Sequence, residues 1–286
     1  MRADKDAIRR VCASQITDAV AALCVEANIS LGADIKNALI KAREAEQSEL
    51  ARFALDTLIK NAELAQRESL PICQDTGMAV VFLSIGRNAH IDGNVENAVN
   101  EGVRRGYREG YFRNSVVADP INRVNTNDNA PAVIYYDFYD GDAIKITVAP
   151  KGFGSENMSG VRMLKPSDGM SGIEDFIVET ARSASASPCP PIIVGVGIGG
   201  TMEKAALLSK QALLRDIGEK NPDPFWADAE ERLLTRLNAL NIGPAGFGGA
   251  TTALAVNILT FPTHIAGLPA AVNIGCNVTR HKTAVI

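Results

Sequence analysis

Apolar residues in the first quarter of the chain recur with the spacing of an α-helix. Between Ile8 and Ala27 they stand three or four positions apart, so they would share one helix face. The pattern continues as far as Pro71, where a polar run interrupts it. We therefore expect a helical N-terminal segment over 1–70, with helices near 5–27, 33–46 and 48–66.

Beyond residue 70, short apolar runs alternate with amphipathic segments. The runs that predict buried strands are 79–86, 132–136, 143–148 and 192–196. The segments that predict helices lie near 95–109, 171–185, 202–216, 223–240 and 250–260. Because Asp140-Gly141 is a favoured hairpin turn, we expect the second and third strands to pair directly. This order predicts an α/β (α+β) fold in one domain over 1–286, with helices around a mixed sheet in 71–286.

Composition narrows the class of protein. The chain has 286 residues, 46% of them hydrophobic, and a net charge of −4, which is typical of a soluble globular protein. We find no polybasic stretch for nucleic acid and no apolar run of the about eighteen residues that span a membrane. The first residues, Met1 to Asp6, lack the features of a secretory signal. We expect a cytoplasmic protein.

The five cysteines fall into two groups. An odd number spread over a long chain argues against a disulfide framework and for a reducing compartment. Cys12 and Cys24 lie in the first helical pattern, where we expect both to be buried as small apolar residues. Cys73, Cys189 and Cys276 instead stand beside Pro or Gly, outside any periodic segment.

The three loop cysteines are too far apart in sequence for a local metal knuckle, so only the fold could assemble them. Three thiolates could hold three irons of an iron–sulfur cube and leave the fourth iron open for Lewis-acid catalysis. With His264 or His281 they could instead form a closed zinc site. Scattered cysteines are also often inert packing residues.

Two other sets of residues carry candidate chemistry. Gln74 and Asp75 follow Cys73 directly, and they offer an amide and a carboxylate that could orient and protonate a substrate. The run 195–200 matches G-x-G-x-x-G between a predicted strand and a helix, the setting of a dinucleotide-binding dehydrogenase. No strand that ends in an acidic residue follows cleanly, which favours a tight strand-to-helix turn instead. A second glycine-rich loop, 151–159, could bind a carboxylate through its amides.

Five motifs in order carry a family resemblance. They are Ile72-Cys73-Gln74-Asp75-Thr76-Gly77, Val124-Asn125-Thr126, Lys151-Gly152-Phe153-Gly154-Ser155-Glu156-Asn157, Cys189-Pro190-Pro191 with the glycine run 194–200, and Leu268 to Cys276. From about residue 5 to its end, the chain resembles the α subunit of the two-subunit class I fumarases. The α subunit of L(+)-tartrate dehydratase is similar.

The resemblance implies an oxygen-sensitive [4Fe–4S] hydro-lyase and its site. The implied ligands of three irons are Cys73, Cys189 and Cys276, and the implied substrate-binding residues are Gln74, Asp75, Arg113, Gly154 and His264. Asp75 is the implied catalytic proton donor to the leaving hydroxyl. An arginine such as Arg113 suits a carboxylate, because its fork binds both oxygens.

In the family the residue thought to act as base belongs to another domain or to a β subunit. The resemblance therefore implies a β partner, assembly as an α₂β₂ heterotetramer and a dicarboxylate substrate. The segments 151–157 and 251–256 look closer to the fumarase pattern, so fumarate is the expected substrate and L(+)-tartrate the alternative. Phe153 and Gly275-Cys276-Asn277 depart from residues common in the family.

Overall fold

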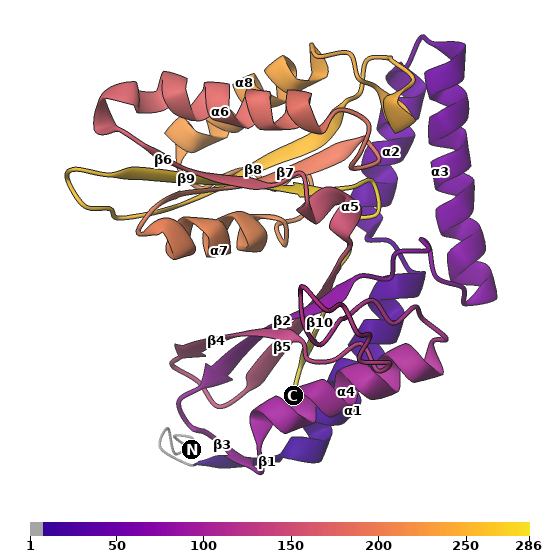
Figure 1. Ribbon diagram of the computed structural model, residues 1–286, viewed down its shortest axis with the longest axis vertical. Coiled ribbons are helices and arrows are strands. Elements are labelled where there is room, and N and C mark those ends of the chain that lie inside the picture. Colours follow the sequence, from indigo (N-terminus) through magenta and orange to yellow (C-terminus); the bar gives the residue numbers. More distant parts are fainter. Residues whose placement is uncertain (1–7) are drawn as a thin grey trace, which may run out of the picture. The chain divides into compact units, whose positions relative to one another are not determined.

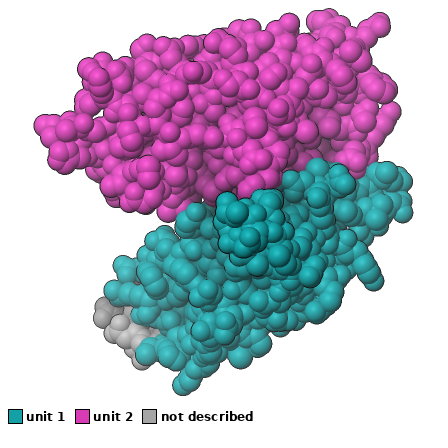
Figure 2. All heavy atoms as spheres, viewed as in Figure 1, with its two compact units in different colours: residues 1–31, 64–152, 280–286 teal, residues 32–63, 153–279 magenta. Residues whose placement is uncertain are grey.

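The computed structural model describes residues 8–286 (Figure 1). The chain forms two compact units that interleave in sequence (Figure 2). Unit 1 consists of 64–152, 280–286 and the described residues of 1–31, and unit 2 consists of 32–63 and 153–279. The helical segment expected over 1–70 is thus divided between the units. That 1–286 acts as one domain stays a prediction.

Unit 1 is a mixed sheet covered by two helices. Its elements are β1 (Arg9–Cys12), α1 (Ala13–Ile29), β2 (Met78–Gly86), β3 (Ala89–Asp92), α4 (Val95–Glu109), β4 (Val133–Tyr139), β5 (Ile144–Lys151) and β10 (Lys282–Val285). The strand order is β10-β5-β2-β4, and β1 pairs with β3 in a small parallel sheet. Helices α1 and α4 pack on each other, and α1 packs on β5. The core includes Val81, Leu83 and Ile146.

The hairpin expected between β4 and β5 is wrong. β2 lies between them, parallel to β4 and antiparallel to β5. The Asp140-Gly141 turn passes over the end of β2, where the amide of Gly86 donates to the carbonyl of Ala143 at 2.9 Å. A Cβ on Gly86 would lie 2.6 Å from Gly141, so only glycine allows this crossing. The nine-residue β2 is buried along most of its length, as is typical of a central strand.

Unit 2 has helices on both faces of a second mixed sheet. Its elements are α2 (Ala33–Ala45), α5 (Phe153–Glu156), β6 (Gly160–Leu164), α6 (Gly169–Ala184), β7 (Ile192–Gly199), α7 (Met202–Ala212), α8 (Pro224–Asn238), β8 (Ala253–Phe261) and β9 (Leu268–Gly275), with 3₁₀ turns at Pro166–Asp168 and Pro244–Gly246. The strand order is β6-β9-β7-β8. Helix α7 covers one face, and α6 and α8 cover the other (Figure 1). Helix α3 (Glu49–Glu68) begins in unit 2 and ends in unit 1.

Mixed sheets with surrounding helices and a helical N-terminal segment confirm the predicted α/β class. The helix predicted near 250–260 is wrong, because those residues form β8 at the edge of the second sheet. Most residues of β8 from Ala253 to Ile258 are buried. A short, mostly apolar run has no continuous polar face to set a period, so its sequence does not distinguish a buried strand from a helix.

The glycines of the 195–200 run have a packing role. A Cβ on Gly195 would lie 2.1 Å from the carbonyl oxygen of Ser209, and one on Gly197 would lie 2.0 Å from that of Ala205. Both carbonyls belong to α7, which therefore packs directly on the backbone of β7. Close helix–strand contact explains these glycines without a bound nucleotide.

One apolar stretch among the described residues, 13–45, is long and apolar enough by composition to cross a membrane. Such a stretch was not expected from the sequence. In the structure it is two helices, α1 and α2, separated by residues 30–32. Ile16, Val20 and Leu23 of α1 lie in the core of unit 1. We therefore interpret α1 as a core helix.

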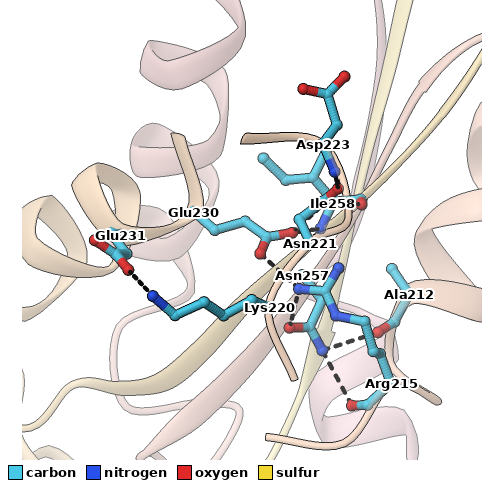
Figure 3. A network of polar contacts seen from close by, with 9 residues as sticks. All are labelled: Ala212, Arg215, Lys220, Asn221, Asp223, Glu230, Glu231, Asn257 and Ile258. Carbon is cyan, nitrogen blue, oxygen red and sulfur yellow. Dashed lines mark hydrogen bonds and ion pairs between the residues drawn. The ribbon is translucent and has the colours of Figure 1, made fainter. Parts of the chain in front are cut away.

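A buried ion pair lies beside β8, the edge strand of the unit 2 sheet (Figure 3). Arg215 donates to Glu230 at 2.6 Å, and their side chains are only 11% and 9% exposed. Glu230 also accepts from Asn221 at 2.9 Å and from the amide of Ile258 at 2.7 Å. The carboxylate thereby joins α8 to β8 and to the loop after α7.

Candidate active site

The Cys73 loop begins where α3 ends. Helix α3 ends at Glu68, because Ser69 adopts a left-handed backbone (φ 54°). Pro71 then prevents the helix from continuing. The amide of Ile72 then donates to the carbonyl of Asn28 at the end of α1 at 2.9 Å. The next residues emerge from the core: Cys73 is partly exposed and Gln74 is exposed. The polar run predicted as a site is therefore open to a ligand.

Buried side chains hold the far end of this loop. The Tyr107 hydroxyl, on α4, lies 2.7 Å from the carbonyl oxygen of Thr76 and 3.0 Å from that of Gly77. Burial raises the pKa of Tyr107, so the phenol stays a hydrogen-bond donor. The side-chain amide of Asn129 donates to the same Gly77 carbonyl at 3.1 Å. These contacts fix the backbone beside Asp75.

The Asp75 carboxylate is oriented by its own loop. Its Oδ1 accepts from the amide of Gly77 at 3.0 Å. Gly77 has φ of 76°, and a Cβ there would lie 2.7 Å from the backbone of Lys151. A Cβ on Gly152 would stand 3.0 Å from Asp75 Oδ2. The first glycine of the 152–154 loop therefore lies against the predicted proton donor.

Arg113 lies next to the Cys73 loop through its backbone. Its carbonyl accepts from the Thr76 hydroxyl at 3.1 Å, and its side chain is exposed. An exposed guanidinium is able to receive a carboxylate through both of its oxygens. Four predicted site residues thus come together in unit 1: Cys73, Gln74, Asp75 and Arg113.

Arg280 was not recognised from the sequence. Its Nη2 donates to the Asp75 carbonyl at 2.8 Å and its Nε donates to Asn28 Oδ1 at 3.2 Å. Arg280 is 5% exposed. The only signal in the sequence was a lone arginine four residues after Cys276, which is indistinguishable from a solvated one without the fold.

The structure also joins the segments of the other two cysteines, in unit 2. Cys189 precedes β7, and Cys276 follows β9. Because β7 and β9 are antiparallel neighbours, both cysteines lie at the same end of these two central strands. The backbone amide of Asn277 donates to the Cys189 carbonyl at 3.2 Å, and its side-chain amide donates there at 2.7 Å. Cys189 has a left-handed backbone (φ 53°) and is exposed.

Gly154 lies near the same end of these strands. It lies in the short α5, exposed, and a Cβ there would be 3.7 Å from the carbonyl of Ser187, two residues before Cys189. Glu156 fastens α5 by accepting from Lys210 at 2.7 Å and from Asn273 on β9 at 2.9 Å. Gly154, Cys189 and Cys276 therefore lie near the same end of the strands β7 and β9.

His264 is not among them. It precedes β9, whereas Cys276 follows it, and eight extended residues span about 25 Å. His264 is exposed and lines a cavity of about 530 Å³ together with Lys204 and Phe261. Its role in substrate binding stays a prediction. The other histidine considered as a zinc ligand, His281, lies in unit 1.

The described residues, 8–286, contain scattered rather than clustered metal-ligand side chains. No three His, Cys, Asp or Glu side chains gather closely enough there to hold an ion. The donor set is nevertheless suited to an iron–sulfur cluster, because thiolates are its usual protein ligands. The tie between Asn277 and Cys189 also brings two of the three thiol-bearing segments together. We conclude that the three thiols suit an iron–sulfur cluster, and that His264, at the opposite end of β9 from Cys276, does not fit a closed zinc site with Cys276.

Comparison with known proteins decides the family. The model of the fumarate hydratase (Fumerase) family matches residues 17–285. The chain belongs to the fumarate hydratase family. A protein of Methanocaldococcus jannaschii, provisionally named an L(+)-tartrate dehydratase subunit alpha, is 43% identical over 92% of this chain and 94% of its own length. The L(+)-tartrate dehydratase subunit alpha of Escherichia coli K12 is 30% identical over 96% of this chain and 91% of its own.

These matches confirm the resemblance to the fumarase and tartrate dehydratase α subunits. Hydro-lyase chemistry is what the family description and the relatives' names share. The fumarate hydratase family match also covers both units, from α1 in unit 1 through the sheet of unit 2 to β10.

Proposed function

We propose that this chain is the α subunit of a [4Fe–4S] hydro-lyase that reversibly hydrates fumarate to L-malate. One observation carries the proposal: the Cys73-Gln74-Asp75 run is held open to solvent by buried contacts on both sides. Core packing does not require an exposed amide beside a partly exposed thiol and carboxylate. A reactive site requires that arrangement.

Each residue of the run has a role that its placement supports. Cys73, Cys189 and Cys276 would hold the cluster, which supplies an open iron as Lewis acid for the substrate hydroxyl. Asp75, with one oxygen on the Gly77 amide, delivers a proton to the departing hydroxyl. Gln74 and Arg113 bind a substrate carboxylate, on which negative charge grows as the neighbouring proton is removed.

The proposal includes a β subunit. The relatives are named as α subunits, which favours a partner that completes the site and supplies the base. An α₂β₂ assembly is the simplest closed form that pairs two such complexes. The α chain alone is therefore expected to hydrate fumarate far more slowly than the pair.

L(+)-tartrate is the second candidate substrate, and the relatives' names favour it. The family description favours fumarate. One reason for expecting fumarate was the segment 251–256, taken as a helix. It lies in and before strand β8, with Thr252 accepting from the amides of Ile242 and Gly243, and its resemblance to the fumarase pattern supports fumarate by sequence alone.

The test is anaerobic reconstitution of the full α chain with iron and sulfide, alone and with its β partner. Hydration of fumarate is followed by its ultraviolet absorption, and dehydration of L(+)-tartrate by the oxaloacetate formed. We expect fumarate turnover by the pair only, with about four irons per α chain. A higher kcat/KM for L(+)-tartrate than for fumarate would transfer the proposal to the second candidate.

The same preparation tests the other classes of function. A brown protein that air bleaches supports the cluster. A colourless protein that binds zinc tightly under strict anaerobiosis, or one that retains NAD and ignores oxygen, would overturn the proposal. The triple variant Cys73→Ser, Cys189→Ser, Cys276→Ser is the matched control, because it removes the ligands and leaves Cys12 and Cys24 in place.

A further inference from the structure

Arg280 is a buried cation in the C-terminal segment, and it spans two regions of unit 1. Its Nη2 donates to the carbonyl of Asp75 at 2.8 Å, and its Nε donates to Asn28 Oδ1 at 3.2 Å. A buried guanidinium loses much hydration free energy. An apolar side chain would fill the same space at lower cost, so this position needs directed N–H groups.

Asn28 shows why the contact is directional. It is 1% exposed, and its side-chain amide donates to the Cys24 carbonyl in α1 at 3.0 Å. Its own carbonyl accepts from the amide of Ile72 at 2.9 Å. Asn28 thus holds the chain one residue before Cys73, while Arg280, bonded to Asn28, holds the chain two residues after it.

The strand that follows Arg280 is fixed as well, which gives the guanidinium a firm base. The strand β10 starts at Lys282 and pairs antiparallel with β5, with Lys282 opposite Val148. Thr283 and Thr147 share a hydroxyl contact of 2.8 Å across this pair. Arg280 therefore reaches the loop from an anchored strand.

We infer that Arg280 is a positioning residue that sets the orientation of the Asp75 carboxylate by fixing the Asp75 carbonyl. The inference rests on the proposed function of Asp75 as proton donor. The Gly77 amide follows the Asp75 peptide in the chain, so a change of ψ at Asp75 moves that amide away from the carboxylate that it orients.

The test compares Arg280→Ala with Lys282→Met, two losses of a cation in the same C-terminal segment. Lys282 pairs with Glu26 at 3.2 Å and makes no described contact with the Cys73 loop. In the reconstituted α–β enzyme, we expect Arg280→Ala to lower kcat by about 10- to 100-fold, because small misplacement of a reacting group has that cost. KM changes little, and Lys282→Met keeps the kcat of the wild type.

Two further readouts separate positioning from simple destabilisation. Millimolar guanidinium added to Arg280→Ala is expected to restore much of the lost kcat, and it leaves Lys282→Met unchanged. In the full α chain without cluster or partner, hydrogen exchange at the Gly77 amide should rise in Arg280→Ala, while exchange in β5 stays as in the wild type.

The results that overturn the inference differ from those that overturn the function. Wild-type kcat in Arg280→Ala, or an equal rise of exchange throughout unit 1 without guanidinium rescue, refutes a positioning role. Absence of turnover in the wild-type pair refutes the hydro-lyase proposal instead. Exchange at Gly77 then still decides whether Arg280 fixes the loop.

Discussion

The two cysteine-bearing regions are built in opposite ways. In unit 1, the Cys73 loop leaves α3 and is held by side chains: Tyr107, Asn129 and Arg280 each bond its carbonyl oxygens. In unit 2, Cys189 and Cys276 adjoin central strands, so the sheet itself places them. The first region is sensitive to single side chains, whereas the second depends on sheet register and on one asparagine.

Asp75→Asn gives the largest expected effect, and it falls on the side-chain-held region. The amide keeps the size of the carboxyl but cannot deliver its proton, so kcat of the α–β pair should fall by about 10²- to 10⁴-fold. Steady-state kinetics measure this. The control is Asp140→Asn in an exposed turn, and equal kcat values for both variants would remove Asp75 from the mechanism.

Glu230→Ala tests how far unit 2 depends on its buried network. Its loss leaves the Arg215 cation buried without its carboxylate, and we expect the free energy of unfolding to drop by about 3–5 kcal/mol. Urea denaturation of the full α chain measures the change. Glu231→Ala breaks the exposed pair with Lys220, 3.6 Å apart, and should cost at most about 1 kcal/mol. Similar losses of unfolding free energy in Glu230→Ala and Glu231→Ala would show that the buried ion pair stabilises the chain no more than the exposed one.

Asn277→Ala tests the one side-chain tie in the second cysteine region. It removes the 2.7 Å bond to the Cys189 carbonyl and keeps the backbone bond, for an expected loss of about 1–2 kcal/mol in unfolding free energy. The iron content after reconstitution should fall with it. The exposed Asn122→Ala serves as control, and an unchanged iron content in Asn277→Ala would show that the sheet alone places both thiols.

The smallest effect concerns the thiols themselves. Burial raises the pKa of Cys24 to about 12, so iodoacetamide at pH 9 should leave it unmodified in the folded apo chain while it alkylates the exposed Cys189. Mass spectrometry after digestion checks this. Because the Cys24 thiol has a higher pKa in the folded chain, its contribution to the free energy of unfolding is complete below about 8.5, its pKa in the unfolded chain. That contribution is lost as the pH rises towards about 12. Rapid modification of Cys24 would refute its burial.

Much of the fold followed from local patterns. The structure places four elements close to their predicted ranges: the helices α2, α3 and α4 and the strand β2. Long amphipathic or apolar runs predict such elements from local sequence alone. Cys24 is buried as expected, but Cys12 is exposed at the start of α1. The strands β3, β6, β9 and β10 were not predicted, and the residues of β1 and β8 were predicted to be helical.

The candidate site divides in the same manner. The sequence identified Cys73, Gln74 and Asp75 from an unusual run of polar residues. It gave no sign that Tyr107, from α4, would hold their backbone.

The sequence by itself determined the residue types and their order, and with them the family, the α/β class and the thiol, amide and carboxylate chemistry. Only the tertiary structure decided which of these residues meet. It joined the segments of Cys189 and Cys276 and left His264 at the other end of β9. The physical reason is range: helical period and turn chemistry act over a few residues, whereas strand pairing and buried hydrogen bonds join residues more than a hundred positions apart, as Arg280 and Asp75 show.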